Sequence, residues 1–331
     1  MLSAVSRASA VRAFSSLAAR AEAQHPIKNV TIFGAGFMGA GIAQVSAEAG
    51  YNVKLVDVSS AAAEKGVAGI KSNVARDARK KFAELAKTSA EQAAESERKH
   101  VEAIVGRIQA TDKLESAVAE ADLVIEAIVE NIKVKQDLFR KLDAHAPKHA
   151  ILASNTSSLR VTDIASATNR RDRVGGLHFF SPVPVMKLVE IVRTDDTSND
   201  THAALLDFGK SVKKVTVSCK DTPGFVVNRL LVPLMLEAIR MLERGDASKE
   251  DIDAAMKFGA NHPMGPLELG DFVGLDVCHS IIEGWHQSYP DVQLFNPSPL
   301  LTKLVSEKKF GRKTGEGFYV YPPAAPKPAK K

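Results

Sequence analysis

One histidine and one glutamate have the spacing of a general base and its partner. His178 lies at the end of the apolar run Val174–Phe180, just before Ser181-Pro182, and Glu190 lies in a second apolar run, Lys187–Val192. Ligands bind at the carboxyl ends of strands in open α/β sheets. If the two runs are adjacent strands, the carboxylate would fix the tautomer of the imidazole and stabilise its protonated form. An isolated histidine at such a place is more often structural, so Glu190 strengthens the hypothesis.

A second group of residues suits a dinucleotide. The loop Gly34-Ala35-Gly36-Phe37-Met38-Gly39 has the G-x-G-x-x-G pattern, follows a β-branched run (residues 29–33) and opens an Ala-rich helical stretch. These glycines permit a tight turn, close approach of the pyrophosphate and close helix–strand packing. Asp57 follows at the end of the next apolar run and would hold the ribose hydroxyls while repelling a 2′-phosphate. The pattern therefore predicts NAD binding in preference to NADP.

Two further polar sites complete the candidate chemistry. The run Ser154–Ser158 follows a predicted strand, so its hydroxyl groups should face the same cleft. Asn228 lies among apolar neighbours on a predicted helix, and a buried amide needs a partner. That partner is either a substrate or a neighbouring helix, and the residues alone leave both interpretations open.

Alternating strands and helices must position these residues. Residues 29–58 predict a strand, a glycine turn, a helix ending at Gly50 and a second strand, which is a βαβ unit. Such alternation favours an α/β fold, a Rossmann-type doubly wound and mainly parallel sheet. Further strands are expected at Ala121–Ile128, His149–Ser154, Val174–Phe180, Lys187–Val192 and Lys214–Ser218.

Two segments depart from this alternation. Residues 60–110 are highly charged without a strand signal, which predicts a helical excursion from the sheet; their basic residues are by themselves typical of a solvated helix face. From Thr222-Pro223, expected as N-cap and first turn, the chain becomes mostly helical, with a stop at Gly245, a capping box at Ser248 and one possible strand at Gly317–Tyr321. The expected domains are residues 25–221 and 222–321, with a disordered tail at 322–331.

The first 24 residues differ in composition from the rest. Residues 1–21 hold three arginines, several serines and alanines, and no acidic residue, which is typical of a mitochondrial transit peptide; a plain disordered tail is the alternative. Removing residues 1–24 reduces the net charge from +5 to +3, which does not favour nucleic-acid binding. No apolar stretch approaches the roughly 20 residues of a membrane span. Cys219 and Cys278 lack metal-cluster spacing and are expected as small buried side chains.

Together these motifs resemble the L-3-hydroxyacyl-CoA dehydrogenase family over essentially the whole chain from Ile27 to Tyr319. Within it the chain is most similar to the single-function mitochondrial members, because no hydratase domain is attached. The matching stretches are Gly34–Gln44 with Asp57, Ala127–Asn131, Ser154–Leu159, Gly176–Glu190, Lys220–Leu231, Gly245–Asp253 and Phe310–Tyr319.

The resemblance implies roles for particular residues. It makes His178 the general base and Glu190 its partner, with Ser157 and Asn228 at the substrate oxygen. It places Glu130, Lys135, Ser157 and Lys313 beside NAD. It places Asn73, Lys80 and Ser157 at coenzyme A, whose phosphates lysines attract. Two positions depart from the family pattern: Ser181 stands where Asn is common near the nicotinamide, and Asn73 stands where some relatives have Ser. The stretch between Phe82 and Val101 is also longer than usual.

The implied reaction is NAD-dependent oxidation of (S)-3-hydroxyacyl-CoA to 3-oxoacyl-CoA in fatty-acid β-oxidation, without a metal. The resemblance further implies a homodimer in the mitochondrial matrix. One alternative is a different hydroxyacid dehydrogenase, but those commonly use a catalytic lysine or cysteine. Another is a non-catalytic relative, since a lens crystallin shares the fold. The His178/Glu190 pair speaks against the first alternative, and retention of His178, Glu190, Ser157 and Asn228 together speaks against the second.

Overall fold

The computed structural model describes residues 26–322, which divide into two compact units between Phe225 and Val226. The first unit is an α/β domain and the second is helical, so the predicted fold class is confirmed. The predicted leader lies outside the described residues, as does the tail beyond Pro322.

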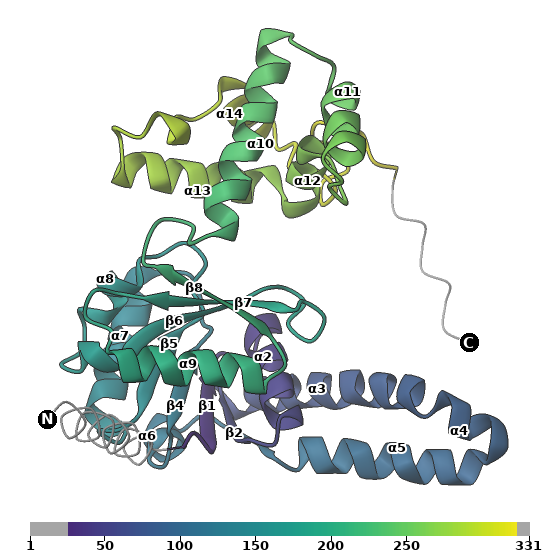
Figure 1. Cartoon of the computed structure of the whole chain (residues 1–331), viewed down its shortest axis with the longest axis vertical. Helices are drawn as coiled ribbons and strands as arrows, with labels where there is room; N and C mark the ends of the chain where they lie inside the picture. Colours follow the sequence, from purple (N-terminus) through teal and green to yellow (C-terminus); the bar gives the residue numbers. More distant parts are fainter. Residues whose placement is uncertain (1–25, 323–331) are drawn as a thin grey trace, which may run out of the picture. The chain divides into compact units, whose positions relative to one another are not determined.

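An eight-stranded sheet forms the centre of the first unit (Figure 1). Its strand order is β3-β2-β1-β4-β5-β6-β7-β8, so the order reverses between β1 and β4. All neighbouring strands are parallel except β6 and β7. The strands are β1 (Asn29–Phe33), β2 (Asn52–Val56), β3 (Ile108–Thr111), β4 (Leu123–Glu126), β5 (Ile151–Ser154), β6 (Val174–Phe179), β7 (Leu188–Arg193) and β8 (Val215–Lys220).

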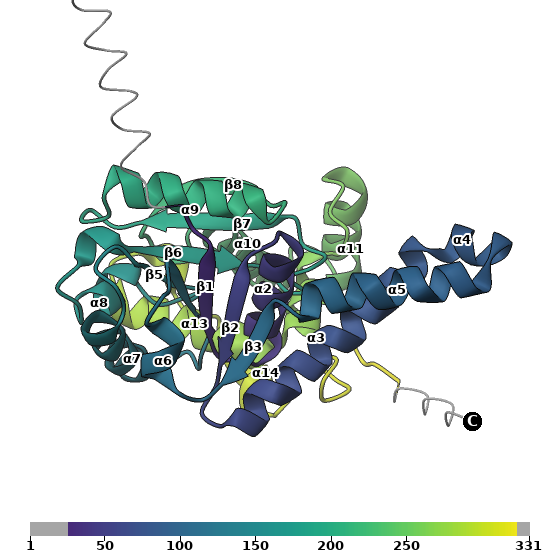
Figure 2. The same ribbon diagram turned by 90° about the horizontal axis from the view of Figure 1, so that it is seen from below.

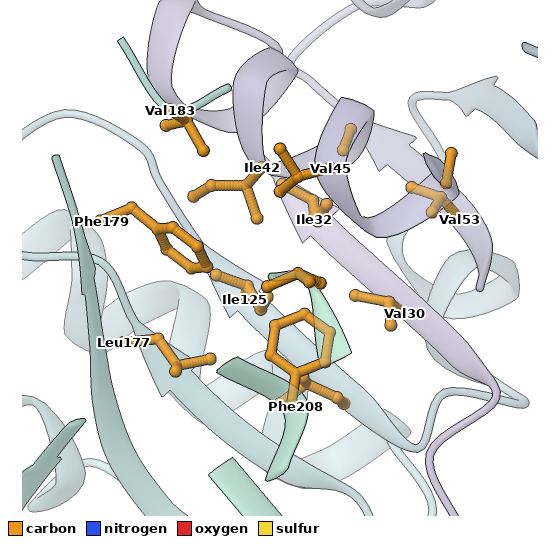
Figure 3. Packing of buried hydrophobic residues seen from close by; sticks show 14 of the residues in the cluster. Val30, Ile32, Ile42, Val45, Val53, Ile125, Leu177, Phe179, Val183 and Phe208 are labelled. Atoms are coloured by element: carbon orange, nitrogen blue, oxygen red, sulfur yellow. The ribbon is translucent and has the colours of Figure 1, made fainter. Parts of the chain in front are cut away.

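Both faces of this sheet are covered by helices because successive strand residues point to opposite faces. On one face Ile32 of β1 packs in a cluster with Ile42 of α2 and Phe208 of α9, as Figure 3 shows. On the other face Phe33 packs with Phe139 of α7. The helices concerned are α2 (Phe37–Glu48), α3 (Ser60–Lys81), α6 (Leu114–Val118), α7 (Ile132–His145), α8 (Val161–Ala165) and α9 (Asn199–Ser211).

The predicted helical excursion is an arm that extends away from the sheet (Figure 2). It consists of α3, the short α4 (Ala83–Thr88) and α5 (Ala90–Val105), with α3 and α5 packed side by side. Serine side chains cap two of these helices, Ser59 on α3 and Ser89 on α5. The absence of a strand signal up to residue 110 was misleading, because β3 begins at Ile108. This strand is short and lies at the edge of the sheet, where it needs little apolar sequence.

The second unit surrounds its own apolar core, which contains Leu236, Leu275 and Trp285. The predicted caps at Gly245, with φ +72°, and Ser248 are confirmed. The predicted start at Thr222 is wrong, because positive φ angles at Gly224 and Phe225 delay the helix until Val227. The helices are α10 (Val227–Arg244), α11 (Lys249–Ala254), α12 (Pro266–Val273), α13 (Leu275–Ser288) and α14 (Pro299–Ser306), with a π-helical turn at Ala255–Gly259.

The expected strand at Gly317–Tyr321 is also wrong. Only isolated bridges form there, such as Glu316 with Val320. The carboxylate of Asp271 accepts the backbone N–H groups of Phe318 and Tyr319 at 2.9 Å each, so these groups are not available to a strand ladder.

Candidate active site

His178 and Glu190 face each other across the one antiparallel strand pair. They are direct partners in the register of β6 and β7, and the imidazole Nδ1 lies 2.7 Å from a carboxylate oxygen of Glu190. His178 is 5% exposed and Glu190 is fully buried. A carboxylate only accepts hydrogen bonds, so Nδ1 carries the proton and Nε2 remains available to a substrate. The rings of Phe180 and Phe225 pack against the imidazole at centroid distances of 4.5 and 5.5 Å. The predicted juxtaposition is therefore present.

The glycine-rich turn has the geometry that a dinucleotide requires. Gly34 has φ +98°, and a Cβ atom there would lie 2.4 Å from the carbonyl oxygen of Ala127. At Gly39 a Cβ would lie 1.8 Å from the carbonyl oxygen of Gly34, whereas at the exposed Gly36 it would meet nothing within 4 Å. Two glycines therefore shape the turn, and the third leaves the N-terminus of α2 open to a pyrophosphate.

An open groove beside this turn fits an adenosine. It has a volume of about 360 Å³, and Asp57 lies in its wall together with the apolar side chains of Ile128, Val134 and Leu138. The Asp57 carboxylate follows β2 and accepts the backbone N–H of Ala35 at 2.6 Å, which ties it to the glycine turn. Asp112, Asp137 and Lys141 also line the groove. Its apolar side chains suit an adenine ring and the Asp57 carboxylate suits the ribose hydroxyls, so the residues present fit NAD.

The serine loop after β5 is organised by Glu130. One oxygen of this carboxylate lies 2.6 Å from the Thr156 hydroxyl and 3.0 Å from the backbone nitrogen of Ser157. The backbone N–H and the hydroxyl group of Ser158 also donate to it. Burial alone would raise the pKa of Glu130, but the charge of Lys135 and the hydrogen bonds from Thr156 and Ser157 outweigh it and lower that pKa. Glu130 is therefore ionised at neutral pH.

Behind Glu130 lies a buried ion pair that sequence reasoning missed. Lys135, 1% exposed, contacts Glu126 at 2.5 Å and Glu130 at 3.0 Å. Glu126 is fully buried and also accepts bonds from the Ser154 hydroxyl and the Ile128 backbone. The signal was a charged residue at the end of the apolar run Leu123–Ile125, which requires a partner nearby.

The other predicted residues have these places. Ser181 is exposed just after β6, and Asn73 and Lys80 lie on α3, with the Lys80 side chain 75% exposed. Asn228 is half-buried in the first turn of α10, in the second unit. Lys313, in the same unit, forms an ion pair with Asp276.

Three further observations concern residues 26–322 alone. No helix there is sufficiently long and apolar to span a bilayer. No group of three or more His, Cys, Asp or Glu side chains is placed to hold a metal ion. Cys278 is buried as expected, whereas Cys219 is only half-buried; burial raises the pKa of both thiols to about 12.

A doubly wound sheet, a glycine turn with its acidic partner and a buried histidine–carboxylate pair define a class, the NAD-dependent dehydrogenases. The profile for the NAD-binding domain of 3-hydroxyacyl-CoA dehydrogenase matches residues 29–222, and the profile for its C-terminal domain matches residues 224–321. The chain belongs to the 3-hydroxyacyl-CoA dehydrogenase family, which confirms the resemblance and the NAD cofactor.

Individual relatives agree with this assignment. The chain is 54% identical over 307 residues to "Hydroxyacyl-coenzyme A dehydrogenase, mitochondrial" of Sus scrofa, covering 93% of this chain and 95% of the relative. The protein of the same name from Homo sapiens is 55% identical over 295 residues, covering 89% and 91%. Among solved structures, (S)-3-hydroxybutyryl-CoA dehydrogenase from Ralstonia eutropha is 41% identical with a TM-score of 0.79, covering 89% of this chain and 99% of that one.

Proposed function

We propose that the protein oxidises (S)-3-hydroxyacyl-CoA to 3-oxoacyl-CoA, with His178 as the general base. The observation that carries this proposal is the buried His178–Glu190 pair at the edge of the sheet where ligands bind. Bound NAD supplies the hydride acceptor. The imidazole Nε2 takes the proton of the 3-hydroxyl group, while Glu190 holds Nδ1–H and stabilises the imidazolium that forms.

The remaining roles concern binding. Glu130 accepts the backbone N–H of Ser157, and the Ser157 hydroxyl group is proposed to contact the reacting oxygen or the cofactor. Asn228 is proposed to contact the substrate, and Lys313 and Ser181 the cofactor. The exposed Lys80 on the arm suits a phosphate of coenzyme A, since an ammonium group binds phosphate as a point charge. The half-buried Asn73, on the same helix, is proposed as a second contact to coenzyme A.

The setting of the reaction is part of the proposal. The pig and human relatives are named mitochondrial, and the composition of residues 1–24 agrees with import into that compartment. We therefore place the enzyme in the mitochondrial matrix, as a homodimer that acts in fatty-acid β-oxidation.

The test is reduction of acetoacetyl-CoA by residues 25–331, followed as loss of NADH absorbance. We expect turnover with NADH and little with NADPH, because Asp57 repels a 2′-phosphate. Longer 3-oxoacyl-CoA thioesters would then rank the chain lengths. Bound NADH without turnover of any 3-oxoacyl-CoA would contradict the proposal and favour a non-catalytic relative or a different hydroxyacid substrate.

A further inference from the structure

The buried ion pair behind the serine loop belongs to a cluster of three charges. Glu126 and Lys135 are 0% and 1% exposed, and the Glu130 side chain is 35% exposed. Lys135 lies between the two carboxylates, at 2.5 Å from Glu126 and 3.0 Å from Glu130. We call these three residues the Glu126–Lys135–Glu130 cluster.

The hydrogen bonds define the charge of this cluster. Glu126 accepts from the Lys135 ammonium, from the Ile128 backbone N–H at 2.8 Å and from the Ser154 hydroxyl at 2.6 Å. A group that accepts on both oxygens and donates nowhere is a carboxylate. Glu130 likewise accepts from every partner, so two negative charges oppose one positive charge. In the described part of the chain no other ion pair reaches either carboxylate, and the net charge is −1.

The fold places this charge on one half of the cofactor site. A dinucleotide crosses a doubly wound sheet where the strand order reverses, here between β1 and β4. The glycine turn follows β1 and Asp57 follows β2, and both mark the adenosine half. The cluster lies at the carboxyl ends of β4 and β5, on the side that also holds His178 in β6. This is the side of the nicotinamide.

The two redox states of the cofactor differ in charge on that side. The oxidised nicotinamide ring carries a positive charge and the reduced ring is neutral. A net negative charge therefore attracts the oxidised form and has no comparable effect on the reduced form. Because Glu126 and Lys135 are buried, solvent and salt screen their field weakly.

We propose that the Glu126–Lys135–Glu130 cluster tunes the enzyme's relative affinity for the oxidised and reduced dinucleotide, with the buried Glu126 supplying the charge that makes the cluster negative. The inference deepens the proposed function, because it relies on hydride transfer occurring above β4–β6. Favouring the oxidised form in this way assists the binding of NAD and its exchange for product NADH.

The test uses equilibrium binding without substrate. NADH is titrated by its fluorescence and NAD by competition, and the readout is the ratio of the Kd for NAD to the Kd for NADH. Glu126→Gln is isosteric and removes one negative charge, so we expect this ratio to rise by roughly three- to thirtyfold. Ser154→Ala is the matched control, because it removes a hydrogen bond to Glu126 and no charge; its ratio should stay within about twofold of wild type.

A double variant separates charge from structure. Glu126→Gln combined with Lys135→Met replaces the pair by neutral side chains and keeps the net charge at −1, so the ratio should return to the wild-type value. Should Glu126→Gln alone not fold, Glu130→Gln in the double-variant background removes the last charge and should raise the ratio by a similar factor. The proposal is overturned if removal of the charge leaves the ratio of the Kd for NAD to the Kd for NADH unchanged. It is also overturned if Ser154→Ala changes this ratio as much as Glu126→Gln does. A failure of His178 as the base would instead appear only in turnover.

Discussion

Replacing Glu190 by Gln removes the charge of the His178–Glu190 pair and keeps its shape. The amide oxygen of Gln can still accept the Nδ1–H bond, which is 2.7 Å long in the wild type, so the tautomer of the imidazole is retained. The substitution therefore tests charge stabilisation of the imidazolium, separately from the orientation of the ring.

The structure gives the expected size of the effect. At an effective dielectric constant of about 20, two unit charges about 4 Å apart attract by about 4 kcal/mol. With half of the imidazolium charge developed in the transition state, the loss is about 2 kcal/mol, or roughly 30-fold in kcat. Full development sets an upper limit of roughly 1000-fold.

The assay compares kcat for Glu190→Gln, His178→Gln and the double variant, with NADH binding measured for each as a control on the fold. Since Glu190 acts through His178, the double variant should be no slower than His178→Gln alone. A Glu190→Gln enzyme within about threefold of wild type, or a double variant slower by the product of both effects, would refute the dyad.

Three more predictions concern the cofactor turn and the serine loop. Gly36→Ala should fold, because its Cβ points into open space, and should bind NADH at least about tenfold more weakly, because the N-terminus of α2 is then less open to the pyrophosphate. Gly39→Ala should instead destabilise the fold through its clash with Gly34. NADH titration and thermal unfolding distinguish the two variants. Asp57→Asn should weaken NADH binding roughly tenfold and narrow the preference over NADPH by a similar factor, as Kd values for both would show; unchanged discrimination would remove Asp57 from cofactor choice. Glu130 has a folded-state pKa below its ordinary 4.5, so its ionised form stabilises the fold above that pH, and this contribution is lost as the pH falls through the folded pKa. Urea unfolding should therefore show that Glu130→Gln loses less free energy of unfolding than the wild type when the pH is lowered. The difference should be at most about 1 kcal/mol, because Glu130 is one-third exposed. An equal loss of unfolding free energy in both proteins would contradict this.

The strongly patterned parts of the chain could be predicted from sequence. The strands that carry His178 and Glu190 are apolar runs, and a turn such as Gly34–Gly39 has few structural alternatives. The strand β3 could not be predicted, because Ile108–Thr111 contains one large apolar residue and lies at the sheet edge. Its pairing with β2 depends on the tertiary fold.

Long-range contacts explain the other two places where the predicted elements differ from the structure. Thr222-Pro223 has good helix-start chemistry, but the chain turns with positive φ at Gly224 and Phe225, and this turn buries the Phe225 ring against His178. The segment Gly317–Tyr321 is rich in aromatic residues, which favour strands, yet the carboxylate of Asp271, distant in sequence, accepts the backbone N–H groups of Phe318 and Tyr319.

The buried Glu126–Lys135 pair could not be predicted either, because it too depends on a contact made by the tertiary fold. Its members are nine residues apart, one in a strand and one in a helix, and only the fold brings them within 2.5 Å. The sequence resemblance predicted that Lys135 and Glu130 lie beside NAD. It gave no reason to single out Glu126, whose proposed role rests on its burial and on the three groups that donate hydrogen bonds to it.

The most direct test of the central claim is the rate at which His178→Gln forms NADH from (S)-3-hydroxybutyryl-CoA and NAD. The variant should bind NADH as the wild type does, because the glycine turn and Asp57 are untouched, and its kcat should fall by at least about a thousandfold. A His178→Gln enzyme that binds NADH normally and turns over at a rate near that of the wild type would show that another group accepts the proton.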